Sequence, residues 1–214
     1  ERLVQQQQGG VEDQRAGQRH ALLLPARELR RIVVRVLGEP DEAHELVHPR
    51  RGARSGGFPR APRDEPRLLH ARFGNLHIVN TYVPQGRAID HPMFAYKVNW
   101  FARLRRWFDA RFAPTDALLW VGDLNVAAEP IDVHNPEERA EHVCFHADAR
   151  RAFARARAWG FEDLFRRFHP EPGHYTFFDY RQPYTPARAT GWRLDYILAS
   201  APLARRARAC RIDP

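Results

Sequence analysis

A chain of 214 residues is long enough for one domain, or for one domain and part of another. Its formal net charge of +8 and pI of about 10.3 favour a polyanionic partner. The chain is also rich in Arg and Ala, with Lys97 as its only lysine, and this composition equally fits a GC-rich genome. No apolar run approaches the length that crosses a bilayer, and the Gln-rich start of the sequence is no signal peptide, so we expect no membrane association.

The two cysteines, Cys144 and Cys210, lie far apart in the sequence and form no Cys-x-x-Cys motif. Their spacing argues against a disulfide framework and against a zinc site. It fits a reducing compartment, so we expect a cytoplasmic protein.

Residues 1–54 form an atypical segment that is rich in Gln and Arg. Residues 21–37 have an amphipathic pattern that fits a helix or a helix followed by a strand. His44 and His48 are four residues apart, as in some metal sites, but a proline follows directly and no third ligand is evident. We therefore interpret them as structural or disordered. Residues 50–66 are rich in Arg, Gly and Pro and predict a loop.

A β-hairpin is predicted after this loop. Residues 68–73 and 76–81 flank the pair Gly74-Asn75, which is a strong hairpin signal. The second strand leads directly to Tyr82. This tyrosine either closes the rim of a sheet or points its phenol into a cleft.

Residues 92–112 predict a long helix, because apolar side chains recur at three- and four-residue spacing. The apolar stripe comprises Phe94, Val98, Phe101, Leu104, Phe108 and Phe112. Arginines at the other positions predict a solvated face.

Residues 118–126 (LLWVGDLNV) predict a buried strand that runs into Gly122. Asp123 and Asn125 follow at alternate positions, so both side chains point to the same face if the chain is extended. A carboxylate can hold a hard cation or take a proton, and an amide can donate to an anionic oxygen. The alternative is a plain turn, since Gly, Asp and Asn are common turn residues.

Two more helices are predicted after the central strand. Residues 148–159 predict a helix with Asp148 as its N-cap and Gly160 as its C-terminal stop. Residues 163–168 predict a shorter helix that is closed by a proline.

Two strand-like runs follow these helices. Residues 175–181 are aromatic, and residues 191–200 are largely apolar. Asp195 lies inside the second run, where an acid is costly unless it is paired. We therefore favour a functional role for Asp195.

Six runs of residues carry a resemblance to a known family. They are residues 80–86 (NTYVPQG), 121–127 (VGDLNVA), 131–133 (IDV), 159–163 (WGFED), 177–181 (FFDYR) and 191–200 (GWRLDYILAS). In order and spacing they resemble the exonuclease III group of AP endonucleases, within the endonuclease/exonuclease/phosphatase superfamily. The resemblance runs from about Gly57 to the end of the sequence.

The resemblance implies an α+β fold, a DNase I-like two-sheet α/β sandwich with flanking helices. This copy would lack the family's N-terminal strands and its C-terminal strand. Residues 55–214 would be a partial domain of the family, and residues 1–54 would be foreign to it or poorly ordered.

The resemblance also implies roles for individual residues. Asp123 would orient or deprotonate the attacking water, Asn125 would hold the scissile phosphate, and both would help to bind the metal ion. Tyr82 would contact the same phosphate, and Asp195 would orient a catalytic histidine. The substrate-binding residues that the resemblance implies are Gln85, Phe177, Arg181, Trp192 and Leu194.

The implied reaction is the hydrolysis of phosphodiester bonds in DNA, with 3′–5′ exonuclease and abasic-site endonuclease activity in base excision repair. Carboxylate, amide and water ligands suit Mg²⁺, with Mn²⁺ as the alternative. An abasic nucleotide costs little to flip, so an apolar pocket of Phe177, Trp192 and Leu194 would select it by shape. The partner would be double-stranded DNA, especially abasic sites and 3′ ends, and we expect a monomer.

The sequence departs from the family pattern at both ends. The family's Gln-Glu-Thr segment, whose Glu is the main metal ligand, is not visible in residues 1–54. The sequence also stops before the family's Ser-Asp-His segment, whose histidine pairs with the residue that matches Asp195. We hypothesise that a frameshift, a mis-assigned start or a gene fusion explains residues 1–54, and we expect this chain to have little or no nuclease activity.

Two other functions stay open. A phosphoesterase of the same superfamily would act on a lipid or inositol phosphate, but the Asp-Tyr-Arg run and the aromatic pocket favour DNA. A non-catalytic DNA-binding remnant would bind duplexes in a salt-dependent way without metal-dependent turnover. The sequence pattern fits exonuclease, abasic-site cleavage and 3′-phosphatase activities equally.

Overall fold

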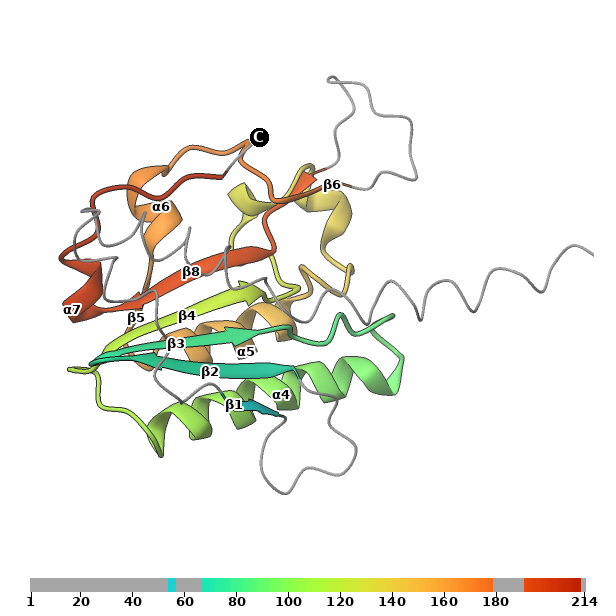
Figure 1. Ribbon diagram of the computed structural model, residues 1–214. Helices are drawn as coiled ribbons and strands as arrows, with labels where there is room; N and C mark the ends of the chain where they lie inside the picture. The colour runs from blue at the N-terminus through green and yellow to red at the C-terminus, as the bar shows by residue number, and fades with distance from the viewer. Residues whose placement is uncertain (1–53, 57–66, 179–190, 213–214) are drawn as a thin grey trace, which may run out of the picture.

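The structure is a computed structural model that describes residues 54–56, 67–178 and 191–212. These residues form a six-stranded sheet in the order β1-β2-β3-β4-β8-β5, a two-stranded sheet of β6 and β7, and several helices (Figure 1). The strands are β1 (Arg54–Gly56), β2 (Leu68–Phe73), β3 (Leu76–Thr81), β4 (Ala117–Asp123), β5 (Phe161–Asp163), β6 (Phe177–Phe178), β7 (Gly191–Trp192) and β8 (Asp195–Ser200). The helices are α4 (Pro92–Asp109), α5 (Ala147–Arg157), α6 (Leu164–Phe168) and α7 (Ala201–Ala204), with 3-10 turns η2 (Pro130–Asp132) and η3 (Pro136–Arg139). The mixed sheet with its helices confirms the predicted α+β class.

The predicted hairpin has the predicted bounds. Strands β2 and β3 are antiparallel and pair from Leu68↔Thr81 to Phe73↔Leu76. Gly74 in the turn has φ 58°, a left-handed conformation that glycine adopts without strain. Strand β3 then pairs in parallel with β4, because α4 connects the end of one strand to the start of the other.

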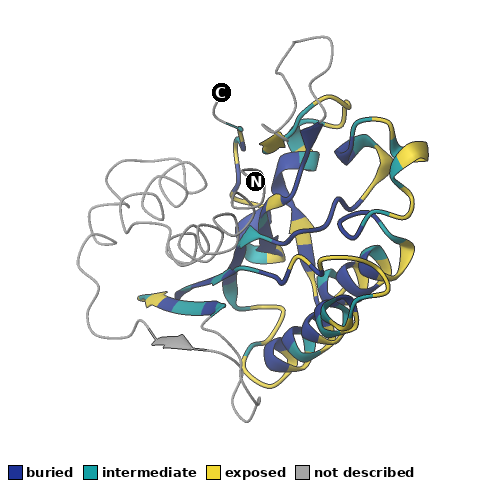
Figure 2. Ribbon diagram, turned by 90° about the vertical axis from the view of Figure 1, so that its right-hand side faces the viewer, coloured by how far each residue is buried: buried dark blue, intermediate teal, exposed yellow. Residues whose placement is uncertain are grey.

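The two faces of the sheet bury two apolar clusters. Along β4 the side chains alternate, so Leu118 and Trp120 pack toward α4 and α5, whereas Leu119 and Val121 pack toward α6 and α7. All four are fully buried. Figure 2 shows buried residues where the helices meet the sheet and exposed residues along the outer sides of the helices. The site-bearing strand β4 is therefore fixed from both faces.

Helix α4 is shorter than predicted and buries a different set of residues. It ends at Asp109, because the backbone N–H groups of Arg111 and Phe112 both donate to the Phe108 carbonyl and close a turn. Its buried residues are Phe94, Lys97, Trp100, Phe101, Leu104, Trp107 and Phe108. The predicted apolar stripe does not include Lys97, Trp100 or Trp107. Among the described helices, none is long and apolar enough to span a membrane.

The starts of the next two helices differ from the prediction. His146, not Asp148, is the N-cap of α5, because its imidazole accepts a hydrogen bond from the Asp148 backbone N–H. Asp163 is the N-cap of α6, where its carboxylate accepts from the backbone N–H groups of Phe165 and Arg166. The predicted start of that short helix is therefore one residue early.

The predicted strand over residues 191–200 is two strands. Gly191 and Trp192 pair with β6, and Asp195 begins β8, which pairs with β4 and β5. The chain leaves the sheet at the intervening Arg193, whose side chain is buried in an ion-pair network. Of the strand-like run 175–181, residues 177–178 form β6, and residues 179–181 lie outside the described residues.

Candidate active site

The ends of β3 and β4 and the start of β8 meet at one edge of the large sheet (Figure 1). Asp123 is the last residue of β4, Asp195 is the first residue of β8, and the two are cross-strand partners. The backbone N–H of Val83 donates to the Asp123 carbonyl over 2.9 Å, which places the segment after β3 beside them. Tyr82, Asp123 and Asp195 thus lie at the same edge of the sheet.

Gly122 allows β3 and β4 to approach closely next to this edge. Its φ is 119°, and a Cβ there would lie 2.2 Å from the Thr81 carbonyl oxygen. A side chain at this position would therefore push Thr81 and β3 away from Asp123.

Asn125 and Asp123 are in direct contact. The Asn125 backbone N–H donates to Asp123 Oδ1 over 2.8 Å, and Asn125 Nδ2 donates to Asp123 Oδ2 over 3.1 Å. Asn125 Nδ2 also donates to the Val83 carbonyl, and its Oδ1 faces the Cys144 Sγ at 3.9 Å. The strand ends at Asp123, just after Gly122, and Asn125 has φ 49°, so the chain is not extended there as the alternate spacing assumed. The sequence left two alternatives, a plain turn or two polar side chains that lie side by side. The structure contains both.

The carboxyl group of Asp123 is poised to titrate near neutral pH. Burial and then the Asp195 charge raise its pKa from 3.8 to about 7, while hydrogen bonds from Asn125 and the charge of Lys97 partly offset them. Desolvation also raises the pKa of Asp195, although this residue is exposed and a hydrogen bond to Thr176 opposes the shift. A carboxylate with a pKa near 7 has the property required of a general base at neutral pH.

Tyr82 presents a protonated phenol at this edge. It is half-buried, and burial and then the charge of Asp123 raise its pKa above the ordinary 10. The Arg67 guanidinium lies 5.0 Å from the centre of its ring. At neutral pH the hydroxyl keeps its proton and can donate it in a hydrogen bond to an anionic oxygen.

Lys97 supports the site through its buried ammonium group, and the sequence patterns assign it no role. Its ammonium group is fully buried and donates to the carbonyl oxygens of Gln85 (3.1 Å), Asn125 (2.6 Å) and Val143 (2.7 Å). Burial lowers its pKa, which the charges of Cys144 and Asp123 oppose. In the sequence, the signal for this role is a lysine that lies among the apolar residues of a predicted helix.

The predicted apolar residues lie around the β6–β7 pair. Phe177 and Trp192 are cross-strand partners, and Phe177 is 40% exposed whereas Trp192 and Leu194 are buried. The His142 ring lies 4.4 Å from the Trp192 ring, centre to centre. The role of these side chains in binding a flipped sugar stays a prediction.

Of the two remaining predicted substrate-binding residues, one lies within the part of the chain that the structure describes. Gln85 is exposed, and its side chain accepts a hydrogen bond from the Arg87 backbone N–H over 2.9 Å. Arg181 lies outside the described residues.

A buried ion-pair network supports the strands that carry these residues. The Arg193 guanidinium contacts Asp132 Oδ1 and Asp163 Oδ2, each at 2.7 Å, and Arg166 contacts Asp132 from the other side. Burial alone would raise the pKa of Asp132, but Arg193 and Arg166 bring it below its ordinary value. Arg193 lies between Trp192 and Leu194 in sequence, so the network holds the break between β7 and β8 in place.

The fold and the edge site together define an α+β protein with a carboxylate, an amide and a phenol at one edge of its large sheet. The chain belongs to the Endonuclease/Exonuclease/phosphatase family, whose model matches residues 22–214. The match begins ahead of Gly57, the point from which the resemblance is visible in the sequence.

Relatives within this family include AP endonucleases and exodeoxyribonucleases. An AP endonuclease from Archaeoglobus fulgidus is 44% identical, with a TM-score of 0.68 over 72% of this chain and 59% of that one. A Neisseria 3′ phosphatase bound to a product DNA hairpin is 30% identical, with a TM-score of 0.63 over 72% and 60%. The exodeoxyribonuclease of Bacillus subtilis is 31% identical over 65% of this chain and 54% of its own length.

These similarities confirm the resemblance to the exonuclease III group of AP endonucleases. Nucleases of this family are of a metal-dependent type. The chain spans less than two thirds of the length of these relatives.

Proposed function

We propose that this protein hydrolyses phosphodiester bonds in DNA as an exodeoxyribonuclease III-like enzyme of base excision repair. The observation that supports this function best is the contact between Asp123 and Asn125, opposite Asp195. It joins a carboxylate whose pKa is about 7 to an amide donor, at the edge where β3, β4 and β8 meet. Hydrolysis of a phosphodiester needs a base for the attacking water and donors for the phosphate oxygens.

Each polar side chain at the edge has one task in this proposal. Asp123 orients the attacking water and takes its proton, and the Tyr82 hydroxyl donates to the phosphate. The Asn125 amide would turn one of its two N–H groups from Asp123 or Val83 to the same phosphate, while its backbone N–H keeps the Asp123 carboxylate in place. Asp195 would orient a histidine. Lys97 acts as a positioning residue, because it joins the loops that carry Gln85 and Asn125.

The residues at this edge fit a hard divalent cation. Two carboxylates on neighbouring strands repel each other unless a proton or a cation lies near them, and oxygen donors suit Mg²⁺ or Mn²⁺. Asp123 and Asn125 would hold the ion. When bound, it would neutralise the negative charge that develops on the phosphate.

The proposed substrate is double-stranded DNA with abasic sites or 3′ ends. A net charge of +8 favours binding to the DNA backbone. Phe177, Trp192 and Leu194 would receive the flipped abasic sugar, with Gln85 and Arg181 contacting the DNA. A monomer in the cytoplasm, without a membrane partner, completes the proposal, and two buried free thiols fit that compartment.

The decisive experiment measures cleavage of an abasic-site duplex and of a 3′-recessed duplex, with Mg²⁺ and with EDTA. Two proteins are compared: this chain, and a version extended with the family's Gln-Glu-Thr and Ser-Asp-His segments. We expect little turnover from the chain alone, because among the described residues no histidine is hydrogen-bonded to Asp195. We expect Mg²⁺-dependent cleavage from the extended version. Asp123→Ala should abolish that cleavage, and Asp109→Ala, an exposed aspartate at the end of α4, should leave it unchanged.

Other outcomes would select the alternatives. Hydrolysis of an inositol phosphate but not of DNA by the extended version would assign the protein to the lipid or inositol phosphoesterases. Salt-dependent duplex binding without turnover in either version would identify a DNA-binding remnant. Strong cleavage by the unextended chain, lost in Asp123→Ala, would overturn the expectation that this chain is impaired.

A further inference from the structure

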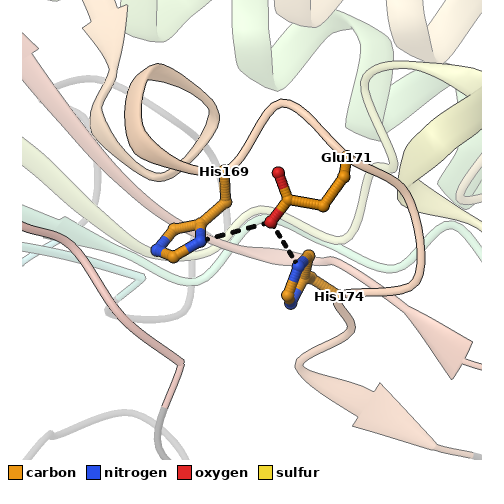
Figure 3. Close-up of side chains that lie close together, drawn as sticks. All are labelled: His169, Glu171 and His174. Carbon is orange, nitrogen blue, oxygen red and sulfur yellow. Dashed lines mark hydrogen bonds and ion pairs between the residues drawn. The ribbon is translucent and has the colours of Figure 1, made fainter.

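A second cluster of ligand-type side chains lies on the segment between α6 and β6. His169, Glu171 and His174 each offer one ligand atom, and these atoms lie within 4.8 Å of one another. The distance from His169 Nδ1 to Glu171 Oε1 is 3.4 Å, and that from His174 Nε2 to the same oxygen is 2.8 Å. Figure 3 shows both imidazole rings turned toward the Glu171 carboxylate. Within residues 54–56, 67–178 and 191–212, this is the group of His, Cys, Asp and Glu side chains whose spacing fits a metal ion.

The partner of the other His169 nitrogen decides which atom faces Glu171. His169 Nε2 lies 2.8 Å from the Cys210 carbonyl oxygen, which can only accept, so Nε2 carries the proton. In a neutral ring, Nδ1 then points a lone pair at a carboxylate oxygen. Two acceptors that face each other at 3.4 Å need a second proton or a cation. A backbone carbonyl behind a histidine in this way is the usual support of a metal-binding imidazole.

The ligand set is held by contacts other than those among its members. The Phe165 ring stacks on His169 with centres 4.7 Å apart and meets the His174 ring edge-on at 5.4 Å. Arg166 Nη1 donates to the backbone carbonyls of His169 (2.9 Å) and Glu171 (2.7 Å). The backbone and both rings are thus positioned before any ion arrives, which reduces the ordering cost of binding.

We propose that His169, Glu171 and His174 bind a divalent transition-metal ion of the Zn²⁺ type. Two imidazole nitrogens and one carboxylate oxygen are ligands that Zn²⁺ prefers, whereas Mg²⁺ prefers oxygen alone. An ion with bonds of about 2.0–2.2 Å places its ligands roughly 3.3–3.6 Å apart in a tetrahedron. The His169–Glu171 distance already matches, and the half-buried His174 side chain would rotate to move its nitrogen from 2.8 Å to that distance from the same oxygen. Water would take the fourth position.

The site would stiffen the segment that leads to the β6–β7 pair. Thr176 follows His174 by two residues, and its Oγ1 accepts from the backbone N–H groups of Leu194 (3.0 Å) and Asp195 (3.1 Å). A bound ion would hold one end of this segment while Thr176 holds the other. The role is structural, and it does not depend on the proposed nuclease function.

Isothermal titration with ZnCl₂ tests the proposal on the full chain after removal of metals with a chelator. We expect one tight Zn²⁺ per chain that excess Mg²⁺ does not displace, and a tetrahedral visible spectrum with Co²⁺. Glu171→Gln and His174→Ala should each weaken binding by at least about tenfold, since even the loss of a supporting residue costs about 10–100-fold. The matched controls are Glu137→Gln, an exposed glutamate in η3, and His134→Ala, a histidine elsewhere. Both should bind like the wild type.

Thermal unfolding provides a second readout. Because a ligand that binds the folded state stabilises it, Zn²⁺ should raise the midpoint of the wild type and of His134→Ala, but not of His174→Ala. Tight binding that survives in Glu171→Gln and His174→Ala would place the ion elsewhere on the chain and overturn the proposal. Absence of tight binding in the wild type would show that the cluster is an ion pair alone. A titration of Asp123→Asn with unchanged Zn²⁺ stoichiometry would confirm that the ion is not at the β4–β8 edge.

Discussion

Asp123 and Asp195 are cross-strand partners at the end of β4 and the start of β8, with the Asn125 amide bound to one of them. Like charges directly opposite each other on neighbouring strands are destabilising. Burial, and then the charge of Asp195, raise the pKa of Asp123 to about 7, so the pair carries a cost in the folded protein that a bound cation would relieve.

Without metal, the chain should become less stable as the pH rises from about 4 to about 7. The pKa of Asp123 is about 7 in the folded state against an ordinary value of 3.8, so between these values the folded protein binds one more proton than the unfolded chain. The free energy of unfolding then falls with pH, by at most about 4 kcal/mol and less after solvent screening. Above pH 7 the effect of this group levels off.

Urea unfolding in EDTA at several pH values measures this effect. The quantity compared is the free energy of unfolding of the wild type and of Asp123→Asn. The difference cancels contributions of other groups, such as Asp132, whose lowered pKa acts in the opposite direction. Asp90→Asn, at an exposed aspartate before α4, is the control for loss of a carboxylate. A wild type and an Asp123→Asn variant with the same pH dependence would contradict the prediction.

Lys97→Met should destabilise the chain by at least about 3 kcal/mol. The substitution keeps the apolar stem but leaves the carbonyl oxygens of Gln85, Asn125 and Val143 buried without their shared donor. Arg105→Met removes a cation from the exposed side of the same helix, where Arg105 pairs with Asp109, and should cost less than about 1 kcal/mol. Equal effects of the two substitutions in urea unfolding would mean that Lys97 does not anchor the three loops.

Local signals made much of the fold predictable, whereas long-range pairing did not show in the sequence. The Gly74 turn determines the hairpin. The side chains of Asp123 and Asn125 lie together as predicted, but through a turn at Asn125 and not through an extended strand. The role of Lys97 depends on carbonyls from three distant segments, which no local pattern contains. The break at Arg193 was missed because its partners Asp132 and Asp163 lie far away in the sequence, so an apolar run was read as one strand.

Arg193→Met should cost about 3–5 kcal/mol, because it leaves the buried carboxylates of Asp132 and Asp163 without their main cation. The exposed Arg151 pairs with Asp148 on the surface of α5, and Arg151→Met should change stability by less than about 1 kcal/mol. Chemical denaturation at neutral pH compares the two variants. If Arg193→Met is as mild as Arg151→Met, then Arg166 alone satisfies the buried acids.

Thr176→Val should loosen the start of β8 while leaving the rest of the sheet intact. Valine has the shape of threonine but no acceptor for the backbone N–H groups of Leu194 and Asp195, which Thr176 Oγ1 accepts together. We expect faster hydrogen exchange at these two amides and a loss of about 1–2 kcal/mol in global stability. Thr115→Val, in the exposed turn before β4, should leave exchange at both amides unchanged. Because Asp195 faces Asp123 across the strands, the variant should also change the pH dependence of stability that Asp123 produces. An unaltered pH profile would show that Thr176 holds the backbone of Asp195 without placing its carboxylate.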